Sequence, residues 1–144
     1  MNGKTLGALA ALPLLALTAC ATSEAMTARM AQPSSEEAAR YLAAAPVGDP
    51  VSCLSTHQIR QTEGLSGNAI LFETVGGDLF RNELNASCPG ARRDASFSYR
   101  IPGPRLCRGE ILQFFDPFSG MEYGACSLGD FVPIEDPDDM DAAE

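Results

Sequence analysis

Apolar and polar residues alternate most clearly over residues 96–101, where Phe97 and Tyr99 share one face with an isoleucine and the other face is serine and arginine. A period of two predicts a strand with one buried face. Residues 110–115 hold four large apolar side chains around Gln113, which favours a strand covered on both faces. Both segments predict β-structure.

Two weaker segments flank this pair. Residues 57–62 predict a first strand with Ile59 directed inward, and residues 126–134 predict a final strand. In the final strand Gly129 indicates a bulge, and Pro133 indicates an edge position because proline has no N–H to donate to a neighbouring strand.

A glycine pair, Gly76-Gly77, separates two further apolar segments. This pattern predicts a hairpin with a two-residue turn and positive φ at both glycines. Such a turn would place Phe72 opposite Arg81, so neither face of the hairpin would be purely apolar.

A short helix is predicted ahead of the strands. Ser34 and Glu37 form a capping-box pattern, and Pro46 ends the apolar stripe that follows. The stripe consists of Ala38, Tyr41, Leu42 and Ala45. So short a helix is marginal alone in water, so we expect it to dock on the domain.

These elements predict a mostly β fold: a small antiparallel barrel or sandwich of five or six strands with two disulfides, preceded by a short helix and a tether. Residues 53–134 would form the domain and residues 20–52 the tether. Residues 135–144 carry six acidic side chains and no basic one, which predicts a disordered acidic tail.

Residues 1–19 predict a lipoprotein signal peptide. Lys4 precedes an apolar segment, residues 6–17, that is shorter than a membrane-spanning helix needs. The sequence Leu-Thr-Ala-Cys ending at Cys20 resembles the bacterial lipobox, in which the cysteine is acylated after cleavage. The alternative is ordinary cleavage around Ala19, which would release a soluble protein.

Lipid on Cys20 would attach the chain to a membrane of the bacterial cell envelope, facing the periplasm. Ala21 follows Cys20 where an aspartate could stand. By resemblance to known sorting rules, this residue favours the outer membrane.

The chain has five cysteines, an odd number that needs an explanation in a secreted protein. Lipid on Cys20 leaves four, Cys53, Cys88, Cys107 and Cys126, whose spacings of 35, 19 and 19 residues contain no close pair for a zinc ion. We therefore expect two disulfides. Three pairings are possible, and we favour Cys88–Cys107 with Cys53–Cys126.

The composition argues against several classes of function. Among 144 residues, 10 are basic and 19 acidic, and a net charge of −9 argues against nucleic-acid binding. The chain has one histidine and no phosphate-binding glycine loop, so we expect no metal and no cofactor. Residues 53–134 hold seven arginines against nine acidic residues, so much of the net charge belongs to the tail.

Candidate catalytic groups are few. His57 is the only imidazole, and no nucleophile-elbow motif accompanies it. The carboxylates of the predicted strand region are scattered: Glu73, Asp78, Glu83, Glu110 and Asp116. Charged residues on strands are normally the solvated face.

Arginines gather between residues 92 and 108. Arg92, Arg93, Arg105 and Arg108 form a candidate anion-binding patch for acidic sugars or lipid phosphates. The competing interpretation is that these arginines balance the acidic tail or pair across strands.

Several short segments follow one another in a recognisable order: residues 41–45, Pro50-Val51, residues 68–72, Cys88-Pro89, residues 106–111 and residues 126–131. Over Tyr41 to Ile134 the chain resembles a family of small, secreted or lipid-anchored proteobacterial envelope proteins classed as a domain of unknown function. The resemblance implies a small β domain in the envelope and no established catalytic residue.

Two functions stay open. The first is a non-catalytic binding or structural module for an envelope protein or glycan, favoured because no nucleophile, base and orienting group assemble in the sequence. The alternative is a small periplasmic hydrolase that uses His57 or a pair of carboxylates.

Overall fold

The computed structural model describes residues 21–91 and 95–141. Two helices come first and a third comes last: α1 (Ala21–Met30), α2 (Glu36–Ala43) and α3 (Pro137–Asp141). The strands between them are β1 (Cys53–Ser55), β2 (Ile59–Ser66), β3 (Ala69–Thr74), β4 (Leu79–Glu83), β5 (Ser96–Tyr99), β6 (Arg105–Cys107), β7 (Ile111–Phe115), β8 (Glu122–Ser127) and β9 (Phe131–Ile134).

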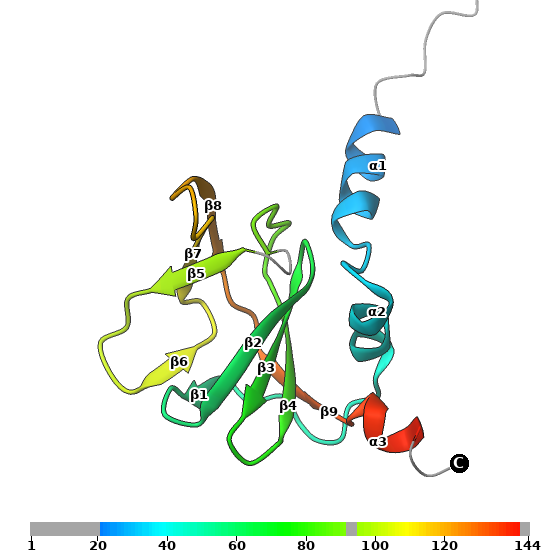
Figure 1. Cartoon of the computed structure of the whole chain (residues 1–144), viewed down its shortest axis with the longest axis vertical. Helices are drawn as coiled ribbons and strands as arrows, with labels where there is room; N and C mark the ends of the chain where they lie inside the picture. The colour runs from blue at the N-terminus through cyan, green and yellow to red at the C-terminus, as the bar shows by residue number, and fades with distance from the viewer. Residues whose placement is uncertain (1–20, 92–94, 142–144) are drawn as a thin grey trace, which may run out of the picture.

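The strands form three antiparallel sheets, with the orders β2-β3-β4-β9, β5-β7-β8 and β1-β6. Figure 1 shows the helices along one side of the four-stranded sheet and the three-stranded sheet on the other side. The predicted mostly β, sandwich-like fold with two disulfides is confirmed. The nine described strands outnumber the five or six expected, because β1 and β6 were not expected and the expected final strand is divided in two.

The core has two parts. Between the sheets, Phe72 and Phe131 meet edge to face, with ring centroids 5.2 Å apart, and Phe114 is buried beside them. On the other face of the four-stranded sheet, Leu71 lies under α2, whose Ala38 is fully buried. β3 is therefore covered on both faces, since its alternate side chains enter the two parts of the core.

The β3–β4 turn differs from the predicted two-residue hairpin. Phe72 lies opposite Phe80, not opposite Arg81. The loop spans residues 75–78 and is closed by Thr74, whose N–H donates to the Asp78 carbonyl at 2.9 Å and whose hydroxyl accepts from the Asp78 N–H at 3.1 Å. These bonds lengthen the turn, and a one-residue change of register exchanges the faces of a strand. Only Gly77 of the glycine pair has positive φ, 88°.

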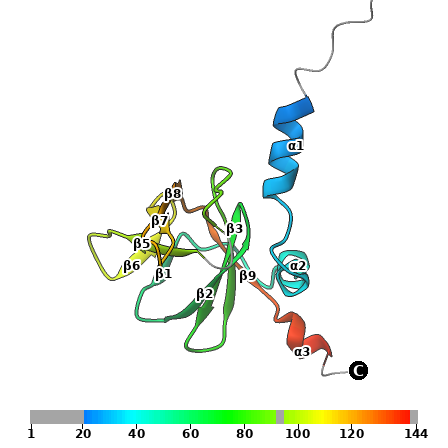
Figure 2. The ribbon, with the colours of Figure 1, turned by 45° about the horizontal axis from the view of Figure 1, so that its top comes forward.

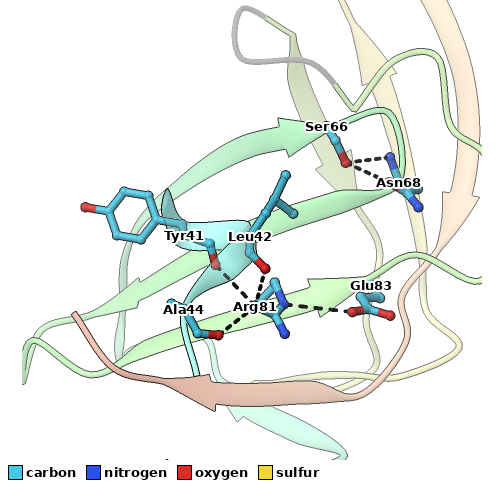
Figure 3. Close-up of polar contacts among 7 residues, drawn as sticks. All are labelled: Tyr41, Leu42, Ala44, Ser66, Asn68, Arg81 and Glu83. Atoms are coloured by element: carbon cyan, nitrogen blue, oxygen red, sulfur yellow. Dashed lines mark hydrogen bonds and ion pairs between the residues drawn. The ribbon is translucent and has the colours of Figure 1, made fainter. Parts of the chain in front are cut away.

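Arg81 consequently faces α2 instead of the inter-sheet core. Its guanidinium donates to the carbonyls of Tyr41, Leu42 and Ala44, at 3.2, 2.9 and 3.1 Å (Figure 3). Carbonyls at the end of a helix have no partner within the helix. Arg81 therefore caps α2 and fixes it to the sheet.

The N-cap of α2 is Ser35, not Ser34, because the Ser35 hydroxyl accepts from the N–H of Ala38 at 2.9 Å. Ser34 instead donates its hydroxyl to the Gly64 carbonyl at 2.9 Å and its N–H to the Leu65 carbonyl at 2.8 Å. The helix docks on the sheet, as its apolar stripe predicts.

The expected final strand is divided into β8 and β9. Between them the buried Asn82 side chain holds Gly129, with bonds of 2.9 Å to its carbonyl and 3.0 Å from its N–H. The Glu83 backbone lies so close that a side chain at Gly129 would collide with it. Pro133 lies in β9, the last strand of its sheet, as predicted.

β7 is also covered less completely than predicted. Leu112 and Phe114 are buried, whereas Ile111 is 55% exposed. The three-stranded sheet thus has one covered face, because the described helices pack against the other sheet.

The favoured disulfide pairing is wrong. The disulfides are Cys53–Cys107 and Cys88–Cys126. β1 and β6 pair antiparallel with Cys53 directly opposite Cys107, a long-range register that cysteine spacing does not contain. The second disulfide joins β8 to the segment after β4.

Residues before and after the predicted domain make contacts with it. The N–H groups of Val47 and Val51 donate to the carbonyls of Pro133 and Phe131, at 3.0 and 2.9 Å, so part of the predicted tether lies along β9. In α3, Asp138 accepts from Arg40 at 2.6 Å and contacts the Tyr41 hydroxyl at 3.2 Å. Asp138 thus contacts α2, although the charge of residues 135–144 predicts a disordered tail.

Candidate functional site: a cleft between two edge strands

An open cleft of about 440 Å³ lies between β2 and β5. β2 is an edge strand of the four-stranded sheet and β5 is an edge strand of the three-stranded sheet. The floor comes from β3, β6 and β7 through Ile70, Phe72, Leu106 and Phe114. The four-stranded sheet therefore contributes one wall, and the three-stranded sheet contributes the other.

Aromatic rings form much of the β5 wall. Phe97 lies 5.7 Å from Phe114 and 6.3 Å from Tyr99, measured between ring centroids. Phe114 is buried, Phe97 is half-buried and Tyr99 is 39% exposed. The rings thus continue from the core to the surface and offer an apolar contact at the mouth of the cleft.

The β2 wall is polar. Arg60, Gln61 and Thr62 line it, and Ser96 of β5 is also among the lining residues. Arg60 forms an ion pair with Glu73 at 3.0 Å, and its side chain is 63% exposed. An exposed pair of this kind is weak, so Arg60 can exchange this partner for a ligand at small cost.

Both walls are sheet edges, where backbone groups lack a neighbouring strand. One end of this free edge of β2 is covered, because Ser34 donates to the carbonyls of Gly64 and Leu65. The middle of β2 lies in the cleft wall.

The candidate catalytic residues do not gather at this cleft. His57 is exposed between β1 and β2 and is not among the lining residues. Asp78 closes the β3–β4 turn, and Glu83 is exposed 3.8 Å from Arg81. One carboxylate oxygen of Glu110 is buried without a hydrogen-bond partner in the described structure.

Asp116 has a structural task at the start of the β7–β8 turn. Its carboxylate accepts the N–H groups of Ser119 and Phe118, at 2.9 and 2.8 Å, and contacts the Tyr123 hydroxyl at 3.3 Å. These backbone N–H groups hold the pKa of Asp116 below its usual value.

No group of three or more His, Cys, Asp or Glu side chains in residues 21–91 and 95–141 could hold a metal ion. None of the helices in those ranges is long and apolar enough to span a membrane.

Two of the four arginines of the predicted anion-binding patch, Arg92 and Arg93, lie outside the described residues, as does Cys20. Arg105 is exposed on β6. Arg108 pairs with Asp130 at 3.2 Å.

Sequence reasoning missed the cleft. The alternation over residues 96–101 identifies the face that carries Phe97 and Tyr99, but it does not show that β2 faces it. Three polar residues in a row, Arg60 to Thr62, are an ordinary feature of an edge strand, so they gave no separate signal.

No family model, curated protein or solved structure matches the chain. The resemblance to small envelope proteins stays a prediction.

Proposed function

We propose that the chain is a lipid-anchored, non-catalytic module of the bacterial cell envelope that binds a protein or glycan partner in the β2–β5 cleft. The observation that carries the proposal is the cleft itself, with a continuous aromatic wall opposite a polar one. Ligand sites commonly combine an apolar surface with a few polar groups that fix orientation.

The aromatic wall suits both classes of partner. Tyr99 exposes an amphipathic ring, and Phe97 is fixed behind it by Phe114. Such rings stack on the apolar face of a sugar or pack against a side chain of a protein. The polar side chains of β2 would then form hydrogen bonds that select the partner.

The anchor rests on the sequence before α1. The apolar segment at residues 6–17 and the lipobox-like ending at Cys20 support lipid attachment. α1 (Ala21–Met30) follows Cys20 in sequence, so it would connect the anchor to the domain. We further propose that the anchor lies in the outer membrane and that the domain faces the periplasm.

An affinity experiment tests the cleft. Protein starting at Ala21, folded under oxidising conditions, is immobilised and exposed to a detergent extract of its own cell envelope. Retained proteins and glycans are identified by mass spectrometry. We expect one saturable partner that survives moderate salt.

Two serines of β5 supply a matched pair of variants. Ser96→Arg puts a long charged side chain on a residue that lines the cleft, whereas Ser98→Arg makes the same change at an exposed residue that does not line it. Ser96→Arg should abolish retention and Ser98→Arg should preserve it. Equal retention by both variants, or an empty column with folded protein, would contradict the proposal.

The anchor is tested separately. The mature protein extracted from cell membranes should have the mass of a chain that starts at an acylated Cys20, and Cys20→Ala should move the protein to the soluble fraction. A mature chain without lipid would refute the anchor and leave the cleft proposal standing.

A further inference from the structure

The β7–β8 turn exposes two large apolar side chains. Phe118 is 99% exposed and Met121 is 61% exposed. Single exposed apolar residues are common on proteins, but neighbouring ones at a protruding turn often mark a contact site. We call residues 116–121 the β7–β8 tip.

The tip holds Phe118 outward by its own hydrogen bonds. The Asp116 carboxylate accepts the N–H groups of Phe118 and Ser119 at 2.8 and 2.9 Å. The Asp116 backbone bonds Met121 and Gly120, each at 2.8 Å, and Gly120 has a positive φ of 70°. A turn closed in this way has little backbone conformational entropy left to lose on binding.

The tip lies at the same end of the molecule as the start of α1. In Figure 1, a straight line that touches the first turn of α1 and the β7–β8 hairpin leaves the rest of the described ribbon on one side, and Figure 2 also shows both toward the upper end of the ribbon. The β3–β4 turn, which contains Val75, lies at the opposite end. A flat surface can therefore contact α1 and the tip together.

The sequence before α1 indicates that this flat surface is a membrane. Residues 1–20 contain the apolar segment and end at Cys20, the proposed lipid site directly before α1. A second apolar contact is useful to a lipid-anchored domain, because it fixes the orientation of the domain on the bilayer.

We propose that the β7–β8 tip inserts Phe118 and Met121 into the interfacial layer of the membrane that carries the Cys20 lipid. This inference rests on the proposed anchor. Asp116 and the exposed Glu122 flank the apolar pair, so the surface that fits is zwitterionic phospholipid, and anionic lipid weakens the contact.

Tryptophan fluorescence tests the tip directly, because the chain contains no tryptophan. Phe118→Trp places a single fluorophore at the tip, and Val75→Trp places one on a 66% exposed residue at the opposite end. Each full, lipidated protein is purified from cell membranes and reconstituted into phosphatidylcholine vesicles with brominated acyl chains. Trp at 118 should be quenched at least about twofold more strongly than Trp at 75.

Composition of the vesicles sharpens the result. Replacing part of the phosphatidylcholine by phosphatidylglycerol should reduce quenching at residue 118. Equal quenching of the two fluorophores would overturn the inference. A blue shift of Trp at 118 that grows with protein concentration without vesicles, together with no preferential quenching in vesicles, would also overturn it, because the tip would then bind a second copy.

Mass spectrometry of the same preparations separates the two proposals. If the mature chain carries no lipid, the anchor and the tip inference fail together. If Cys20 is acylated and Trp at 118 is not preferentially quenched, only the tip inference fails.

Discussion

β3 and β7 are the same kind of strand in different surroundings. Each lies inside a sheet and each is mostly apolar, yet five of six residues are buried in β3 and two of five in β7. The difference is α2, which covers the second face of β3, whereas Ile111 of β7 stays 55% exposed. A covering element, not apolar content, decides how many faces of a strand are buried.

This contrast indicates that the four-stranded sheet mainly stabilises the fold and that the three-stranded sheet mainly supplies surfaces for contact. The four-stranded sheet has core on both faces and an arginine cap on its helix. The three-stranded sheet supplies the aromatic wall of the cleft and the exposed tip. We expect substitutions in the first region to change the free energy of unfolding and substitutions in the second to change binding.

The largest expected effect comes from a core phenylalanine. Phe72 is fully buried against Phe131, so Phe72→Ala should lower the free energy of unfolding by about 3–5 kcal/mol. Phe118→Ala removes the same side chain from an exposed position and should change it by less than about 0.5 kcal/mol. Urea denaturation measures both, and similar losses would contradict the division.

The next effect concerns the Cys88–Cys126 disulfide, which links the two regions. Cys88 donates its N–H to Gly67 in the β2–β3 turn, and its disulfide reaches Cys126 in β8. Replacing both cysteines by alanine should cost roughly 2–4 kcal/mol, because a closed loop of the unfolded chain is released. Hydrogen exchange should rise more in β7 and β8 than in β3. A uniform rise would show that the sheets unfold as one unit.

The cap on α2 gives a smaller effect. Arg81→Met keeps the apolar stem and removes the donor to three carbonyls, so it should lower the free energy of unfolding by about 1.5–3 kcal/mol. The control is Arg60→Met, at the exposed pair with Glu73, which should cost less than about 1 kcal/mol. Equal effects in urea denaturation would mean that Arg81 adds nothing beyond a surface charge.

The loss of stability at alkaline pH should depend on Tyr41 of α2, which packs on the four-stranded sheet. Burial, then the nearby Asp138, raises the pKa of Tyr41 from 10.0 to about 12. The unfolded chain therefore loses this proton first, and stability should fall between about pH 10 and 12. Tyr41→Phe should flatten that fall in thermal melts. If stability falls equally in Tyr41→Phe, other titrating groups cause the fall.

Local pattern predicted the elements that depend on neighbours in sequence. Alternation located β5, and the missing N–H of Pro133 placed β9 at an edge. Ser35 in place of Ser34 as N-cap is an error of one residue, which arose because both serines fit the cap and tertiary bonds to Gly64 and Leu65 occupy Ser34.

Long-range pairing was not predictable from those patterns. The Cys53–Cys107 bridge follows from the pairing of β1 with β6, and the cleft follows from two sheet edges that meet only in the folded chain. The register of β3 and β4 depends on a side-chain bond of Thr74, and the glycine pair alone does not reveal it.

The smallest effect is local and belongs to the tip. The N–H groups of Ser119 and Phe118 lower the pKa of Asp116 from 3.8, so the bonds are complete above pH 3.8 and are lost as pH falls through the lower folded value. NMR should show the Phe118 and Ser119 amide signals moving together, with a midpoint below 3.8. Asp116→Asn keeps an acceptor that does not titrate, so those signals should then stay fixed over the same range. A midpoint at or above 3.8 in the unsubstituted protein would mean that the turn is not pre-organised, and Phe118 would then be mobile instead of presented.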